Sequence, residues 1–115
     1  MARLNQCRAS AGRPEAPTAF IVLWTNLAVD VAAAIREEGL RLGRDCDMVG
    51  WCNEELYAGS YLARFGDGPV PPTITWSLAT MAETTLTRLA ERRNNPDSPV
   101  LRVRIPVRLR TGDEA

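Results

Sequence analysis

The sequence predicts the α/β fold class, with a short parallel sheet and flanking helices, and three observations point to it. Residues 20–24 form a continuous apolar run of the length of a strand that is buried on both faces. A helical pattern and a second apolar segment follow within the roughly thirty residues of a β-α-β unit. A third apolar segment, over residues 73–76, precedes another helical pattern. Because 115 residues suffice for one compact core, we expect a single domain.

The first predicted strand is Phe20–Trp24, and the helix after it is expected from Leu27 to about Glu38. Thr25 or Asn26 can cap this helix, because their side-chain oxygens accept hydrogen bonds from free backbone amides. Gly39 can adopt the left-handed conformation that ends many helices. The side chains expected to pack on the sheet share one helical face: Leu27, Val31, Ala34 and Ile35.

The same helix has a second, smaller apolar face. Its residues, Val29 and Ala33, are either tolerated at the surface or pack on a second subunit or on another part of a larger chain, and the sequence leaves these interpretations open. In the second case we expect a homodimer whose interface includes the following loop, with the residues Val29, Asp30, Ala33 and Leu56.

The middle of the chain is predicted from short apolar segments and turn residues. A second strand is expected at Met48–Trp51, parallel to the first. Asn53–Pro72 is expected to be a long irregular connection, because glycines and prolines interrupt it. The third strand is Thr73–Trp76, and Ser77 should cap a helix that ends near Asn94.

The last segment, Leu101–Arg110, alternates apolar residues with arginines and Pro106. This pattern predicts a half-buried strand at a sheet edge, with its arginines in solvent. We favour this structural interpretation over contact of the arginines with nucleic acid.

The absence of two residue types argues against catalysis. The sequence has no His, and all 14 basic residues are Arg, so there is no Lys. Without His the chain lacks the usual general base that activates a nucleophile and the imidazole ligand for a catalytic metal. Without Lys it lacks the amine that forms a Schiff base. The three cysteines form no C-x-x-C pair and predict neither a metal site nor a disulfide set. We therefore expect no enzyme, no metal and no cofactor, and we interpret Glu54 and Glu55 as solvated charges.

The longest apolar run is too short to cross a membrane, and residues 1–16 lack the apolar stretch of a secretory signal. We expect a cytoplasmic protein with no membrane partner. Residues 1–16 show no periodicity and are expected to be disordered or a remnant of a longer segment.

A ligand should bind at the carboxyl ends of the strands, where open α/β sheets place their ligands. All three tryptophans of the chain lie there, and neighbouring polar side chains can orient a polar ligand. Helix N-termini after Trp24 and Trp76 could add backbone donors. The alternative is that these aromatic residues and Cys52 pack in the core. The candidate ligand-binding residues are Trp24, Thr25, Asn26, Cys52, Asn53 and Trp76.

Several separated motifs together resemble the effector-binding domain of LacI/GalR-type transcriptional regulators. They occur in the family's order between about Pro17 and Arg110: Pro17-Thr18-Ala19-Phe20, Arg36-Glu37-Glu38-Gly39-Leu40-Arg41, Gly43-Arg44-Asp45, Met48-Val49-Gly50-Trp51, Pro71-Pro72-Thr73-Ile74-Thr75-Trp76, Met81-Ala82 and Ile105 to Arg110. The resemblance implies a partial periplasmic-binding-protein-like (Rossmann-like) fold, truncated, with residues 17–112 as a partial sensor domain.

The resemblance also implies a function. A small-molecule effector would shift the population between two lobe arrangements, and DNA would be bound only through a helix-turn-helix head that this chain lacks. The family usually has Asn-Asp at Trp24-Thr25, Asp at Cys52 and Gln at Trp76. In the family these residues hydrogen-bond sugar hydroxyls or other polar effectors. We therefore expect an effector that is sugar-like or more apolar, with a lost ligand site as the alternative. A solute-binding protein of transport and an interaction module that binds no ligand are the alternatives.

Overall fold

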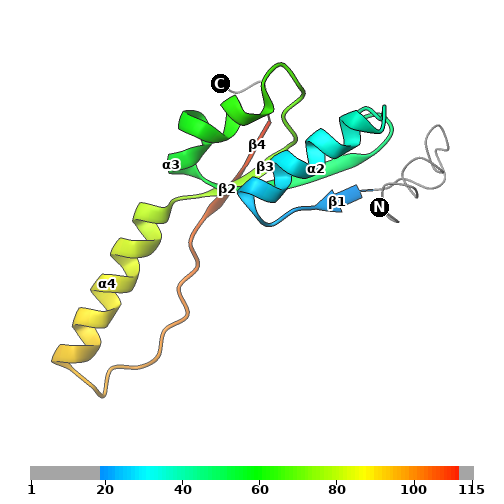
Figure 1. The fold of residues 1–115 in the computed structure, drawn as a ribbon. Helices are drawn as coiled ribbons and strands as arrows, with labels where there is room; N and C mark the ends of the chain where they lie inside the picture. The colour runs from blue at the N-terminus through cyan, green and yellow to red at the C-terminus, as the bar shows by residue number, and fades with distance from the viewer. Residues whose placement is uncertain (1–18, 112–115) are drawn as a thin grey trace.

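The computed structural model describes residues 19–111 and confirms the α/β class (Figure 1). The elements follow in the order β1 (Ala19–Ile21), α2 (Thr25–Glu37), β2 (Asp47–Asn53), α3 (Glu54–Leu56), a π-helical turn (Tyr57–Tyr61), a 3-10 turn (Leu62–Phe65), β3 (Thr73–Trp76), α4 (Leu78–Asn94) and β4 (Val107–Arg110). The expectations for residues 1–16 lie outside the described residues.

The strands form one four-stranded sheet in the order β1-β2-β3-β4. Strand β2 pairs in parallel with both β1 and β3, so the three predicted strands lie side by side and run in the same direction. Strand β4 is antiparallel to β3 and forms the far edge. The sheet is therefore mostly parallel.

One face of this sheet carries the core. Met48 and Cys52 of β2 are buried against Ala28 of α2 and against a row of aromatic side chains from the turns after α3. These aromatic residues are Tyr57, Tyr61 and Phe65. Helix α2 and residues 54–65 thus cover the same face, which we call the covered face.

The opposite face has no helix over it within residues 19–111. Side chains alternate along a strand, so Val49 and Trp51 point away from the covered face. Their neighbours in β1 and β4 are exposed, with Ile21 at 78% and Leu109 at 61%. The prediction that the first strand is buried on both faces is therefore wrong, because β1 is a three-residue edge strand covered on one side only.

The last strand reverses its predicted orientation. Arg108 lies 3.9 Å from Glu54, and the guanidinium of Arg110 lies 6.0 Å from the centre of the Tyr57 ring, so both arginines point to the covered face. Val107 and Leu109 point to the opposite face and are exposed, and Arg108 is itself 71% exposed, as predicted for an arginine in solvent. The strand is also shorter than predicted, because Val107 pairs with Trp76, where β3 ends, and residues 101–106 extend past it.

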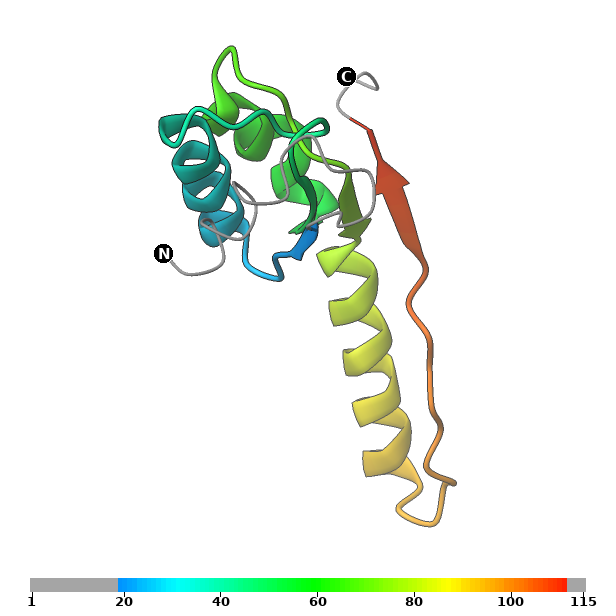
Figure 2. The same ribbon diagram turned by 90° about the vertical axis from the view of Figure 1, so that its right-hand side faces the viewer.

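Helix α4 leaves the sheet and projects into solvent, and an extended segment over residues 95–106 returns along it (Figures 1 and 2). We call these two segments together the arm. No residue of α4 is buried, although its apolar side chains have the predicted helical spacing. The arm gives the described chain its elongated shape, 59 × 29 × 22 Å.

The helix boundaries confirm some local predictions and correct others. Ser77 caps α4 by accepting a hydrogen bond from the amide of Thr80, and Gly39 ends α2 with a φ of 75°. The N-cap of α2 is Trp24, so the predicted cap at Thr25 or Asn26 is wrong.

The prediction of an irregular connection over 53–72 is wrong for residues 54–65, which are helical. Asn53 caps the first turn, accepting from the amide of Leu56 at 2.9 Å. The aromatic spacing of Tyr57, Tyr61 and Phe65, four residues apart, was the signal for this helical stretch.

Candidate functional site

Three of the predicted ligand-binding residues meet at the carboxyl ends of β2 and β3. Asn53 and Trp76 are paired neighbours across these two strands. Thr25, the first residue of α2, donates a hydrogen bond to the carbonyl oxygen of Trp51 at 3.4 Å. The structure therefore brings Thr25 to the end of β2, beside the Asn53–Trp76 pair. We call this region the strand-end edge.

Trp24 and Asn26 flank Thr25 at the start of α2. Trp24 is 75% exposed. The side-chain oxygen of Asn26 accepts a hydrogen bond from Arg64, which ties the start of α2 to the 3-10 turn. The side-chain oxygen of Asn26 therefore already has a partner within the chain.

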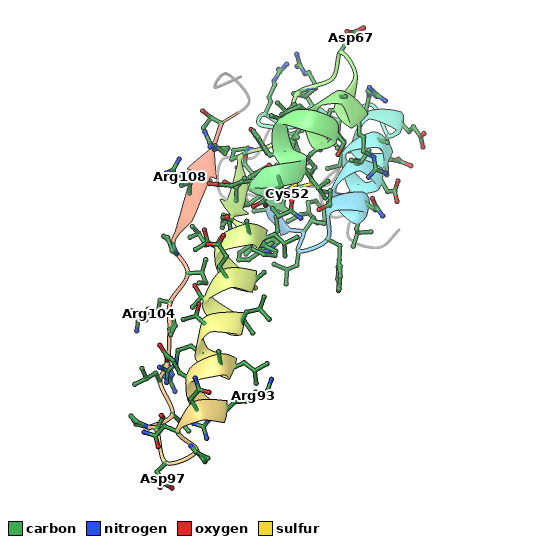
Figure 3. The ribbon with its side chains drawn as sticks, turned by 90° about the vertical axis from the view of Figure 1, so that its left-hand side faces the viewer. Cys52, Asp67, Arg93, Asp97, Arg104 and Arg108 are labelled. Atoms are coloured by element: carbon green, nitrogen blue, oxygen red, sulfur yellow. The ribbon has the colours of Figure 1, made fainter. Side chains whose placement is uncertain are left out.

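Cys52 is separated from this edge by strand alternation. Its side chain points to the covered face and is 1% exposed, between α2 and the aromatic row (Figure 3). The thiol donates to the carbonyl oxygen of Asn53 at 3.3 Å. Burial raises the pKa of the Cys52 thiol, and the hydroxyl of Thr25 opposes this effect. Cys52 thus behaves as a small buried core residue and presents no surface to a ligand at the edge.

Glu55 is the residue at this edge whose role the sequence did not reveal. Its carboxylate accepts hydrogen bonds from the Ser77 hydroxyl at 3.0 Å and from the amides of Leu78 at 3.0 Å and Ala79 at 3.1 Å. These backbone hydrogen bonds lower the pKa of Glu55 to about 2. Glu55 is exposed, as expected of a solvated charge, but it also caps the start of α4, which the sequence did not predict. The free amides at the start of α4, expected to be open to a ligand, are occupied by the protein itself.

The pKa of Glu55 predicts a pH-dependent contribution to stability. Because the folded-state pKa lies below the ordinary value of 4.5, the stabilisation is complete above about pH 4.5 and is lost as the pH falls toward 2. We expect Glu55→Gln to be less stable than wild type at pH 7, with the difference shrinking between pH 4.5 and 2. Urea unfolding across this range measures it. Glu54→Gln is the matched control, and equal pH profiles for the two variants would contradict the assignment.

An apolar cavity of about 360 Å³ lies elsewhere, between α2 and residues 64–69. Val29 and Ala33, two of the predicted interface residues, line it, and Val29 also packs against the core of its own chain. Asp30 and Leu56, the other two, are exposed. The dimer interface on this helix stays a prediction.

Residues 19–111 were compared with the requirements of a metal site and of a membrane-spanning helix, and they meet neither. No cluster of three or more Cys, Asp or Glu side chains there has the arrangement of a metal site. None of the helices in this range combines the length and apolar character that crossing a bilayer requires.

Comparison with known proteins bears on the arrangement of strands and helices described above. A search of curated proteins and a search of solved structures both return no match. The family model described as "Periplasmic binding protein-like domain" matches residues 1–113. The match covers nearly the whole chain, including the parallel strands β1 to β3 and the edge where their carboxyl ends meet. The chain therefore belongs to the periplasmic binding protein-like domain family.

Proposed function

We propose that this chain is a ligand-sensing domain that binds a small, neutral, polar molecule at the strand-end edge. One observation carries the proposal. The indole nitrogen of Trp76 is buried and has no hydrogen-bond partner among residues 19–111, and it lies next to Asn53. A buried donor without a partner costs about 1–3 kcal/mol, so an acceptor on a ligand would recover that energy.

The residues at the start of α2 and at the ends of β2 and β3 favour particular ligand chemistry. The exposed indole of Trp24 offers a flat apolar surface of the kind that sugar rings and nucleobases stack on. The amide group of Asn53 can donate to a hydroxyl or carbonyl oxygen. Glu55 places a negative charge at the same edge and occupies the amides of α4, which disfavours an anionic ligand. A sugar or nucleoside fits this combination.

We further propose that the domain serves a LacI-type transcriptional regulator in the cytoplasm. The support is the ordered set of motifs from Pro17 to Arg110 that resemble that family, together with the parallel strands on which they lie. In such a regulator, a ligand that prefers one arrangement of the lobes shifts the population toward it. The same family match is compatible with a solute-binding protein of transport. A helix-turn-helix reading frame upstream of the Met1 codon would favour the regulator, and an export signal there would favour transport.

Ligand binding at the strand-end edge can be tested by tryptophan fluorescence and thermal shift. A panel of monosaccharides and nucleosides would be screened against the chain. For any compound that binds, Trp76→Phe removes one hydrogen-bond donor and keeps an aromatic ring. We expect it to weaken binding about two- to tenfold, the energy of one hydrogen bond.

Trp51→Phe, two residues before Asn53 on the same strand, is the matched control and should leave affinity unchanged. Equal affinity of wild type and Trp76→Phe for every binding compound would place the ligand elsewhere.

A further inference from the structure

The cavity between α2 and residues 64–69, which we call the α2 cavity, extends into the core of the chain. Ile35 and Leu40 line it and belong to one cluster of buried side chains. Phe65 also lines it and belongs to the other cluster. Each of these three residues is at most 9% exposed. The α2 cavity is therefore a gap between two parts of the core and not a flat apolar patch on the surface.

Small side chains leave this gap unfilled. Ala32 and Ala33 line it from α2. Protein interiors normally leave few voids larger than a water molecule, and an apolar gap offers water few hydrogen-bond partners. The volume of about 360 Å³ lies within the range of about 300–1000 Å³ that small-molecule pockets occupy. The α2 cavity thus has the size and the polarity to hold the apolar part of a small ligand.

The charged side chains that line the cavity are all arginines. They are Arg36, Arg41 and Arg64, and no Asp or Glu lines it. All three are exposed, which places them at the rim. The guanidinium of Arg36 reaches from α2 to the facing segment, since its Nη1 atom lies 3.2 Å from the position that a Cβ atom would take at Gly68. No ion pair with an acid of residues 19–111 neutralises any of the three. The α2 cavity therefore combines an apolar interior with a positive rim.

The parts of the chain outside residues 19–111 are poor matches for this cavity. Residues 1–18 contain three Arg and one Glu, so their net charge has the same sign as the rim. Residues 112–115 contain Asp113 and Glu114 but no apolar side chain larger than that of alanine. Asp67, the acid of the 64–69 segment, lies at the outer tip of its loop (Figure 3). An anion with an apolar body matches the cavity better than any of these segments does.

We propose that the α2 cavity binds an organic acid with an apolar body and a single carboxylate, such as a medium-chain fatty acid. The apolar body fills the gap between Ile35 and Phe65, and the carboxylate accepts hydrogen bonds from Arg36 and Arg41 at the rim. A guanidinium can pair with a carboxylate through two parallel charge-assisted hydrogen bonds, which a neutral head group does not allow. Most of the cavity's α2 residues come from the later turns of the helix, away from Thr25 and the strand-end edge. This site is thus additional to the one proposed at that edge.

Calorimetric titration of the whole chain with octanoate tests the proposal. We expect saturable binding of one octanoate per chain. Octanamide keeps the apolar body without the charge and should bind about tenfold more weakly, the effect of one charge-assisted hydrogen bond. Arg36→Gln should weaken octanoate binding by a similar factor, and Arg44→Gln, at an exposed arginine outside the cavity, is the matched control. Trp76→Phe tests the strand-end edge and should leave octanoate binding unchanged, so the two proposed sites can fail independently. No saturable binding, equal affinity for octanamide, or an equal effect of Arg44→Gln overturns the proposal.

Protection of an introduced thiol locates the bound acid in the cavity. In the Ala33→Cys variant, octanoate at ten times its Kd should slow alkylation of the new thiol about tenfold, measured by mass spectrometry of the peptide that contains it. Ala58→Cys, on the exposed side of the π-helical turn, is the control and should react equally fast with and without octanoate. Equal protection at both positions, or none at position 33, overturns the proposal. Protection at position 33 that needs no octanoate and rises with protein concentration would place a second copy in the cavity, which also overturns it.

Discussion

Replacing Tyr61 with alanine is expected to lower the free energy of unfolding by about 3–5 kcal/mol, the range for removing a large buried aromatic side chain. Tyr61 is fully buried at the centre of the covered face. Its ring lies 5.7 Å from that of Tyr57 and meets the ring of Phe65 edge-on at 5.0 Å. Alanine would leave a cavity between the rings of Tyr57 and Phe65.

Tyr61→Phe separates the ring from its hydroxyl. The Tyr61 hydroxyl lies 3.1 Å from the Thr73 hydroxyl, which itself donates to the carbonyl oxygen of Pro71 at 2.9 Å. Tyr61 is therefore the donor, and phenylalanine should cost only about 1 kcal/mol. Urea unfolding of the two variants measures both effects. Equal losses for Tyr61→Ala and Tyr61→Phe would show that the ring is not the main contributor.

Gly50→Ala is expected to destabilise the chain by about 1–3 kcal/mol through overpacking. A Cβ atom at this position would lie 2.4 Å from the Tyr61 hydroxyl oxygen and 3.1 Å from the Thr73 hydroxyl oxygen. Both of these side chains are fully buried, so neither can move aside freely. Thermal unfolding followed by circular dichroism would detect the loss as a lower melting temperature.

A double-mutant cycle identifies the atom responsible. Tyr61→Phe removes the hydroxyl oxygen that the new methyl group would meet first. Gly50→Ala should therefore cost less in the Tyr61→Phe background than in wild type, and the two losses should not add. Gly59→Ala is a suitable control, because a Cβ atom added there would meet no neighbouring atom within 4 Å. Additive losses would mean that the strain at Gly50 arises from another contact.

Local sequence signals predicted most of the elements. The apolar runs located β1, β2 and β3, and the length of the first β-α-β unit gave their parallel direction. Ser77 and Gly39 marked helix ends correctly, since capping and a positive φ depend on the residue itself and its nearest neighbours. The helical turns of residues 54–65 were missed, because the glycines around the aromatic residues suggested a loop.

The candidate site was predicted only in part. Thr25, Asn53 and Trp76 lie at the strand-end edge as the parallel arrangement requires. Cys52 does not, because one residue of difference along a strand moves a side chain to the other face. The role of Glu55 could not be read from its neighbours in sequence, since its partners Ser77, Leu78 and Ala79 come from another strand-helix junction.

The sequence by itself determined which residues share a face, because alternation in a strand and the helical repeat are local properties of the backbone. Only the tertiary structure decided which of those faces is covered. Arg108 and Leu109 alternate in either case, yet it is the arginine that lies on the covered face near Glu54, and the leucine that lies on the face without a helix. That outcome depends on where α2, residues 54–65 and α4 are placed around the sheet. Such placement is set by contacts between segments that are distant in sequence.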